Sequence, residues 1–172
     1  VELLQATISK KGTFLTVADE FHILNNYVHL QEFRYQGSFR VRYETDEGAE
    51  GCYIPRLILQ PLVENAILHG IDMKEKNGEI ILKAKLEQNR LRLFVIDNGR
   101  GMTKEQIDTL LHSKAKKTNG LSAIGVPNIK ERLELYYGEE GGLVYQSSES
   151  GTTAEIFLRA NTELDRKESR RE

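Results

Sequence analysis

The sequence predicts a two-layer α/β sandwich, with one mixed sheet, helices on one face and an additional N-terminal helix. Three observations favour this class. The 172 residues suffice for one domain with a proper core. Apolar residues make up 39% and charged residues 29%, as in ordinary globular proteins. Strand-like and helix-like segments alternate along the chain without the regularity of βαβ repeats.

The first half contains two helical patterns and one strand. Apolar residues recur at helical spacing from about Asp19 to Arg34, and Asp19 is suited to cap this helix. Residues 39–43 alternate like a strand. A second, more apolar helix is expected over 54–69, with Pro55 in its first turn and Pro61 as a break or kink.

The second half predicts strands and shorter helices. We expect a hairpin of strands 79–86 and 90–96, a short helix at 104–111, a helix at 126–137 that starts near Pro127 and ends at Gly138, and strands at 143–147 and 153–158. Between the two helices, residues 112–124 are polar, basic and glycine-containing. The charges of residues 163–172 alternate and cancel, as in a solvated tail.

Charge and cysteine content exclude several classes of function. With 24 basic and 26 acidic residues the net charge is −2, so no overall field favours nucleic acid or a membrane surface. The single Cys52 excludes an internal disulfide framework and is typical of a reducing compartment. No run approaches 18 apolar residues. Because the chain opens on Val1 in mid-pattern, we expect a piece of a longer protein with a membrane-bound segment upstream.

Polar side chains interrupt the second helical pattern. Glu64 and Asn65 lie within the apolar run from Gln60 to Gly70, and burying them without partners is costly. A ligand or metal would explain them. They could equally face solvent or cap a neighbouring loop.

A second candidate, residues 97–102, directly follows an apolar strand. A carboxylate such as Asp97 at a strand end can accept a hydrogen bond from an exocyclic amine, and Gly99 and Gly101 allow the backbone to approach a flat ring. The alternative is a tight turn in which Asp-Asn-Gly supplies only backbone geometry.

Glycines also precede the helix that begins near residue 126. Gly120 and Gly125 would leave unpaired amides at a helix N-terminus, which favours an anion, and Lys114, Lys116 and Lys117 lie just upstream. The alternative is a flexible loop. The anion at this helix start would be a phosphate group. Near the end of the chain, residues 151–153 could bring hydroxyls and amides to the same phosphates, or simply form a turn. The order of these segments is more specific than any one of them.

These segments together resemble sensor histidine kinases of the LytS/YesM type. The string IPRLILQPLVENAILHG resembles their N box, DNGRGM their first glycine box, AIGVPNIKERLELYYG the second glycine box and its helix, and SGTTAEIFL the terminal Gly-Thr element. Upstream, ADEFHILNNYVHLQEFRY resembles the helix that links the histidine-bearing segment to the catalytic domain. The resemblance covers roughly residues 3–160 in the expected order.

The resemblance implies the Bergerat ATP-binding fold, shared with gyrase-type ATPases (the GHKL superfamily). Asn65 would coordinate Mg²⁺ on the triphosphate, Glu64 would polarise the nucleophile or assist at the metal, and Asp97 would accept from the adenine amine. Further nucleotide contacts would come from the two glycine boxes, the end of the N box and the Gly-Thr element: Gly99, Gly101, Met102, Gly125, Val126, Asn128, His69, Thr152 and Thr153. Residues 103–124 would form the ATP lid.

The implied function is in-line transfer of the γ-phosphoryl group of Mg-ATP to a histidine. Residues 1–36 would end the histidine-bearing dimerisation segment and form the linker helix, 37–160 would be the catalytic domain, and 161–172 a tail. The acceptor lies upstream, in cis or in the dimer mate, because none of the four histidines, His22, His29, His69 and His112, has the acceptor motif. Implied partners are ATP, a response regulator and a second copy of the chain, and not nucleic acid. The implied location is the cytoplasmic side of a plasma-membrane sensor.

Two positions depart from related patterns. Ala123 stands where the second glycine box has its first glycine, which makes the phosphate contacts less secure than those of Asp97 and Asn65. Gyrase-type ATPases carry a hydrolytic glutamate one turn before the metal-binding asparagine, and Pro61 at that place favours a kinase over an ATPase. A third alternative is an interaction module that has lost nucleotide binding. His69 could also serve structurally at a helix C-terminus.

Overall fold

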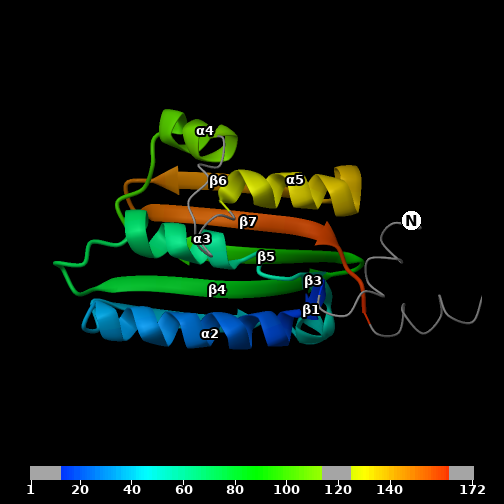
Figure 1. Ribbon diagram of the computed structural model, residues 1–172, viewed down its shortest axis with the longest axis horizontal. Helices are drawn as coiled ribbons and strands as arrows, with labels where there is room; N and C mark the ends of the chain where they lie inside the picture. Colours follow the sequence, from blue (N-terminus) through cyan, green and yellow to red (C-terminus); the bar gives the residue numbers. More distant parts are fainter. Residues whose placement is uncertain (1–12, 114–124, 163–172) are drawn as a thin grey trace, which may run out of the picture.

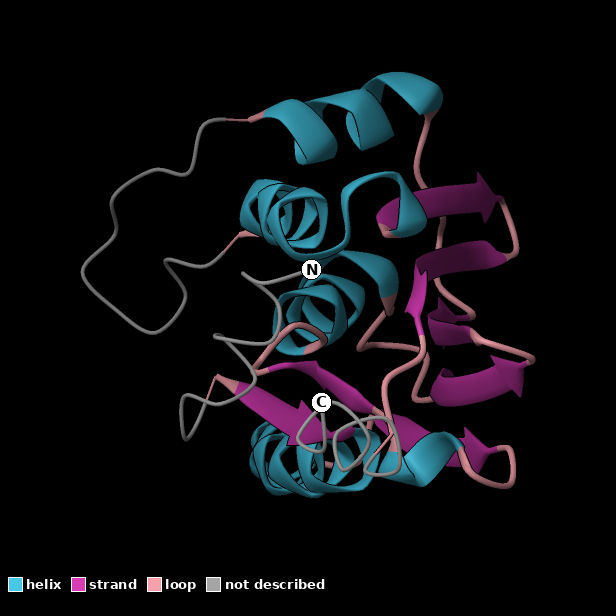
Figure 2. Ribbon diagram, turned by 90° about the vertical axis from the view of Figure 1, so that its right-hand side faces the viewer, coloured by secondary structure: helices cyan, strands magenta, loops and turns pink. Residues whose placement is uncertain are grey.

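A computed structural model describes residues 13–113 and 125–162. Its core is a five-stranded sheet with helices on one face, as Figures 1 and 2 show. The strand order is β2-β4-β5-β7-β6. Strand β2 runs parallel to β4, whereas the other neighbours are antiparallel, so the sheet is mixed. The predicted fold class is confirmed.

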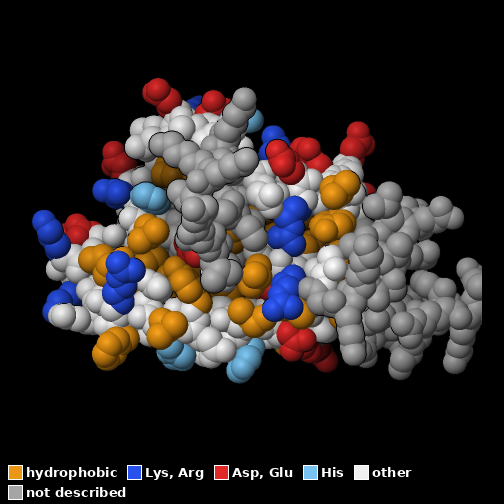
Figure 3. All heavy atoms as spheres, in the orientation of Figure 1, with side chains coloured by type: hydrophobic (Ala, Val, Ile, Leu, Met, Phe, Trp, Pro, Cys, Tyr) orange, Lys and Arg blue, Asp and Glu red, His pale blue; other side chains and the backbone are white. Residues whose placement is uncertain are grey.

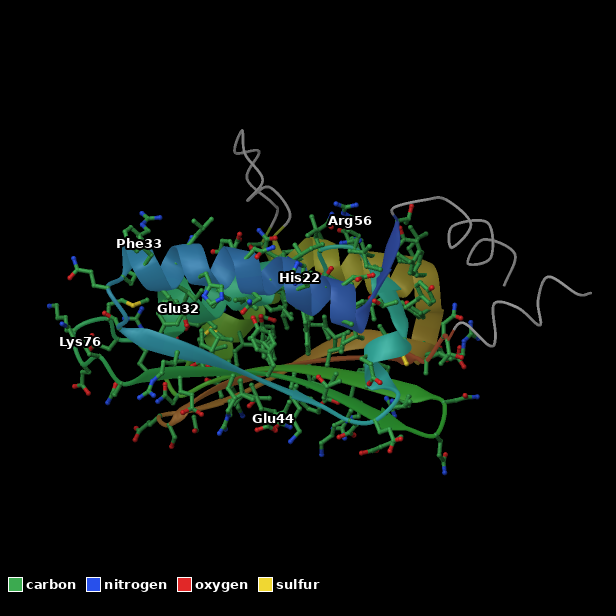
Figure 4. The ribbon with its side chains drawn as sticks, turned by 90° about the horizontal axis from the view of Figure 1, so that it is seen from below. His22, Glu32, Phe33, Glu44, Arg56 and Lys76 are labelled. Atoms are coloured by element: carbon green, nitrogen blue, oxygen red, sulfur yellow. The ribbon has the colours of Figure 1, made fainter. Side chains whose placement is uncertain are left out.

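The sheet has one apolar and one charged face. The strands are β2 (Phe39–Thr45), β4 (Gly78–Glu87), β5 (Arg90–Asp97), β6 (Gly142–Ser148) and β7 (Gly151–Arg159). Side chains alternate across a strand, and every second residue of β5 from Leu91 on is buried against the helices. The opposite face carries ion pairs such as Arg92–Glu155 at 2.6 Å, and Figure 4 shows Glu44 on it.

The first helix of the described residues, α2 (Val17–Arg34), belongs to the same core as the sheet. Leu24 and Val28 are 1% exposed within the common apolar cluster. Its N-cap is Thr16, whose hydroxyl accepts from the amide of Asp19 at 3.1 Å, so the expected cap at Asp19 was wrong by one turn. The role of this helix as a linker to a histidine-bearing segment stays a prediction.

The single helix expected over 54–69 was wrong, because its beginning is used for strand pairing. Strand β1 (Phe14–Thr16) pairs antiparallel with β3 (Tyr53–Pro55), which places Pro55 in a strand. Helix α3 spans Gln60–Asn65 and continues into the π-helical turn η2 (Ala66–Gly70). Pro61 lies in the first turn of α3, where its missing N–H costs nothing, and does not kink a longer helix.

Within residues 13–113 and 125–162, the remaining helices are α4 (Lys104–His112) and α5 (Val126–Tyr137), with short 3₁₀ turns at η1 (Ala49–Gly51) and η4 (Gly138–Glu140). Helix α5 ends at the predicted cap, Gly138, which has a positive φ of +55°. Helix α4 buries no residue and stands beyond the edge of the sandwich in Figure 1.

Within the described residues no helix is long and apolar enough to cross a membrane. Acidic and basic side chains are interspersed over the face drawn in Figure 3. The expectations for residues 1–12 and 163–172, and those for Ala123, Gly120 and the three lysines upstream, lie outside the described residues.

Candidate functional site

A pocket of about 850 Å³ opens between four segments that are distant in sequence. Its walls come from the end of α3 and η2, the turn after β5, helix α4 and the β6–β7 turn. The lining residues are Asn65, His69, Arg100, Gly101, Met102, Thr103, Gln106, Thr109, Leu110, Ser113, Ser148 and Glu149. Four of the residues expected at the site are therefore brought together here.

Asp97 ends β5 as a buried carboxylate, 7% exposed. Its Oδ1 accepts from the amide of Gly99 at 2.9 Å and from the amide of Thr152 at 3.3 Å. Burial raises the pKa of Asp97, and these two amides act against that rise by stabilising the charged form. Both amides point at Oδ1, which fixes the carboxylate and leaves Oδ2 for another donor.

Close backbone contacts join the turn after β5 to the end of the N-box helix. A Cβ on Gly99 would lie 2.0 Å from the carbonyl oxygen of Gly70, so only glycine fits. Arg100 donates from its amide to the carbonyl of Gly70 at 3.1 Å, and from Nε to the carbonyl of His69 at 2.9 Å. These contacts hold the first glycine box against the N box.

Gly101 is required for a second close approach, at φ +75°. A side chain there would be strained, and its Cβ would lie 1.9 Å from the carbonyl oxygen of Ser148 in the β6–β7 turn. The next residue, Met102, donates its amide to the hydroxyl of Ser147 at 2.7 Å. The same hydroxyl lies 2.8 Å from Oγ1 of Thr152, so one serine connects both turns.

The register of the sheet separates the two threonines of the Gly-Thr element. Thr152 pairs with Asp97 and is 6% exposed on the helix side. Thr153 pairs with Ile96 and therefore faces the opposite side of the sheet. Of the two, only Thr152 is beside the carboxylate.

Two residues of β6, Ser147 and Tyr145, were missed by the sequence reasoning. The Tyr145 hydroxyl is buried and has no hydrogen-bond partner within the described structure. Burial raises the pKa of Tyr145, and the Asp97 charge raises it further, so this hydroxyl stays protonated near the carboxylate. The sequence signal that could have revealed them is that polar side chains occupy alternate positions of a strand whose other residues are partly apolar.

Glu64 and Asn65 are adjacent in sequence but point to different surroundings. Asn65 lines the pocket, whereas Glu64 does not. The Glu64 carboxylate accepts from Nε2 of Gln60 at 3.2 Å. Burial is the main cause that raises the pKa of Tyr27 on α2 to about 12, and the negative charge of Glu64 is the second cause. Since the charge acts on Tyr27, Glu64 lies toward α2. Neighbouring residues on a helix point about 100° apart, which explains the separation.

The second glycine box lies at the start of helix α5. Gly125 is the N-cap, the amide of Asn128 donates to its carbonyl at 3.0 Å, and Val126 is 4% exposed. None of the three lines the pocket that the described residues form. Their expected contacts with phosphates stay a prediction.

Fold and site together define an ATP-binding domain of the histidine-kinase kind. Residues 54–162 match the family of Histidine kinase-, DNA gyrase B-, and HSP90-like ATPases, and the chain belongs to this family. The matched range contains every candidate site residue. The resemblance to LytS/YesM-type sensor kinases is confirmed by the relatives described next.

The curated relatives include sensor kinases. The chain is 32% identical to the sensor protein LytS of Staphylococcus epidermidis over 148 residues, which cover 86% of this chain and 25% of the relative. It is 31% identical to the sensor histidine kinase YesM of Bacillus subtilis over 163 residues, 94% of this chain and 27% of the relative. The chain thus spans about a quarter of the length of these relatives.

Solved structures share the fold at low sequence identity. The catalytic domain of histidine kinase ThkA in a nucleotide-free form has a TM-score of 0.63 and 18% identity, covering 86% of this chain and 94% of that one. ThkA in complex with the response regulator protein TrrA has a TM-score of 0.62 and 16% identity, covering 94% of this chain and 48% of that one.

Proposed function

We propose that this domain binds Mg-ATP in the pocket and presents its γ-phosphoryl group to a histidine on another segment. One observation carries the proposal. The buried Asp97 carboxylate, fixed through Oδ1, lies at the base of the same turn that forms a wall of the Asn65-lined pocket. In a family of ATPases this arrangement supports base recognition at one end and phosphate binding at the other.

The residues around Asp97 suit adenine. An ionised carboxylate only accepts hydrogen bonds, so its Oδ2 matches an exocyclic amine and repels a carbonyl. The unpaired hydroxyl of Tyr145 is a second polar group that a base, or a water bound with it, can satisfy. The glycine backbones at 99 and 101 allow close approach of a flat ring.

The residues around Asn65 suit a magnesium ion that arrives with the nucleotide. Among the described residues no group of three or more histidine, cysteine or acidic side chains could hold a metal alone. Mg²⁺ is commonly held by one or two protein oxygens together with phosphates and water. The Asn65 side-chain oxygen supplies one such ligand, and Mg²⁺ when bound would screen the charge of the transferring phosphoryl group.

The contribution of this chain to transfer is binding and orientation. His22 and His29 lie on α2, outside the pocket lining (Figure 4 labels His22). Both ring nitrogens of His29 have partners, Asn25 and Glu32, at 3.1 and 3.2 Å. His69 lines the pocket, and its carbonyl rather than its ring holds Arg100. The acceptor in this proposal is a histidine of an upstream segment, in cis or in the dimer mate, as the family resemblance implies.

The relatives support a wider proposal for the intact protein. A sensor histidine kinase would pass the phosphoryl group to a response regulator and act as a homodimer attached to a plasma-membrane sensor. The complex of ThkA with TrrA supports such a partner for that kinase. Hydrolysis of the gyrase type is not favoured, because Pro61 is buried in the first turn of α3 and offers no base.

Calorimetric titration of the domain with ATP, with and without Mg²⁺, tests the proposal. We expect measurable binding that Mg²⁺ strengthens, and loss of most of this strengthening in Asn65→Ala. Leu68→Ala is the matched control, because Leu68 is on the same turn but 56% exposed and outside the pocket lining. No binding at millimolar ATP, or the same Mg²⁺ effect in Asn65→Ala as in the wild type, contradicts the proposal.

A further inference from the structure

Glu20 on α2 is a charged residue with no exposed surface. Glutamate is almost never fully buried unless it is paired. Here Oε2 accepts from the amide of Leu57 at 3.0 Å, and Oε1 accepts from the amide of Leu59 at 3.4 Å. Burial raises the pKa of Glu20, and these amides, with the charge of Arg132, act against that rise. Nothing in the proposed nucleotide contacts uses this carboxylate.

The two amides belong to the segment that leads into the N-box helix. Leu59 is the N-cap of α3 and supplies no side-chain cap, so the helix start depends on a group from elsewhere. Leu57 has φ +56°, a left-handed conformation that is strained for a residue with a branched side chain. Such a conformation persists only when surrounding contacts determine it, and Glu20 provides one of them.

A second helix holds the same segment from the other side. Arg132 on α5 donates from Nη2 to the carbonyl of Arg56 at 2.8 Å. Figure 4 shows Arg56 beside the N-terminal part of α2. Residues 56–59, called here the junction, therefore connect α2, α3 and α5. The junction thus leads into the helix that ends with Asn65, and it contacts the helix that begins after Gly125.

We propose that Glu20 is a positioning residue that sets the start of α3 and thereby places the Asn65 side chain for the metal-bound triphosphate. The inference rests on the proposed function. Helix α3 has six residues, and at 1.5 Å per residue it spans only about 9 Å, so Asn65 lies within two helical turns of the junction. A displacement of the junction therefore displaces Asn65 by a similar amount. Misplacement of a contact by about 1 Å is enough to impair phosphoryl transfer.

Glu20→Gln is the informative substitution because it keeps the shape of the side chain. A glutamine has one carbonyl oxygen, and its NH₂ group would face the second amide donor of the junction. One of the two amides, Leu57 or Leu59, therefore loses its acceptor while packing is preserved.

The matched control is Val28→Ala. Val28 is 1% exposed on the same helix, and its truncation removes packing without removing a hydrogen bond. The readout is the ratio of ATP dissociation constants without and with Mg²⁺, measured beside the thermal unfolding midpoint of each variant. A role in stability alone lowers the midpoint and leaves this ratio unchanged.

For Glu20→Gln we expect the Mg²⁺ ratio to fall about three- to tenfold, with ATP affinity in the absence of Mg²⁺ unchanged. Val28→Ala should lower the unfolding midpoint and keep the wild-type ratio. An unchanged ratio in folded Glu20→Gln overturns the inference. Absence of Mg²⁺-dependent ATP binding in the wild type overturns the proposed function instead, so the two failures are distinguishable.

Arg132→Ala provides a second test if Glu20→Gln does not fold. It removes the hydrogen bond to the Arg56 carbonyl and so weakens the contact between α5 and the junction. Unlike Glu20→Gln, it places no NH₂ group opposite the buried backbone amides. We expect the ratio to fall in the same direction by about two- to fivefold. A wild-type ratio in Arg132→Ala then overturns the inference.

Discussion

At the residue scale, Asp97 is the side chain that we propose to recognise the base of the nucleotide. Its Oδ1 is occupied by the amides of Gly99 and Thr152. An asparagine here would keep its carbonyl oxygen toward these amides and turn its NH₂ group toward the base. The change from acceptor to donor should reverse the hydrogen-bond preference of the site.

We therefore expect Asp97→Asn to bind ATP at least about tenfold more weakly, since an unpaired polar group costs about 1–3 kcal/mol. Binding of inosine triphosphate, which has a carbonyl in place of the amine, should weaken less or improve. Competition of both nucleotides for one fluorescent analogue measures the ratio. Equal losses for both nucleotides would show that Asp97 does not read the amine.

The buried hydroxyl of Tyr145 gives a second prediction at this scale. Tyr145→Phe should weaken ATP binding about two- to tenfold, the worth of one hydrogen bond. The free energy of unfolding should not fall, because the substitution removes a buried hydroxyl that has no hydrogen-bond partner among the described residues. Calorimetry and chemical denaturation measure the two quantities.

Tyr43→Phe is the matched control for that prediction. The Tyr43 hydroxyl is also buried without a hydrogen-bond partner in the described residues, but Tyr43 lies on β2, at the opposite edge of the sheet from β6. Its loss should leave ATP affinity unchanged. Equal affinities of wild type and Tyr145→Phe would mean that Tyr145 takes no part in base recognition.

At the element scale, α4 is held by local contacts. The Thr103 hydroxyl accepts from the amide of Gln106 at 3.1 Å, and the Gln106 side chain accepts from the amide of Thr103 at 2.8 Å, which is a complete capping box. None of its residues is buried, yet three of its residues and both of its cap residues line the pocket. The helix therefore borders the site although none of its side chains is fully buried.

Thr103→Ala should destabilise α4 by about 1 kcal/mol without a comparable loss in global stability. Hydrogen exchange of the α4 amides should become about fivefold faster, while exchange in β5 and β7 stays unchanged. The comparison within one protein serves as the control. A uniform increase in exchange across the sheet would show that α4 unfolds only with the whole domain.

At the scale of the whole molecule, two buried carboxyl groups influence stability in the same direction. Burial raises the pKa of both Glu20 and Asp97 in the fold. A carboxyl group with a raised folded-state pKa contributes stability that is fully present below its unfolded pKa, about 4, and is lost as pH rises through the folded pKa. These two groups therefore favour the folded state least at neutral pH.

Asp97→Asn removes one of these contributions. The free energy of unfolding of the variant minus that of the wild type should increase as pH rises from about 4 to 7. Denaturant unfolding at several pH values measures this difference and cancels the titration of all other groups. A difference that moves toward the wild type with rising pH would mean that Asp97 is stabilised as a carboxylate in the fold.

The sequence by itself determined the class of fold, most elements and the order of the site motifs. Helix α5, the β4–β5 hairpin and the two last strands lie within two residues of their predicted bounds, because hydrophobic periodicity and cap residues are local signals. Asp97 and Asn65 could be chosen because a strand end and an apolar helix make a polar residue conspicuous.

Only the tertiary structure decided what these residues meet. The pairing of Tyr53–Pro55 with β1 overrode a helical pattern, since strand pairing depends on residues about forty positions away. The register of β7 against β5 placed Thr152, and not Thr153, beside Asp97. The bonds from Glu20 to Leu57 and Leu59 are equally invisible locally. Contacts between distant segments depend on how whole elements pack, and no local pattern records that packing.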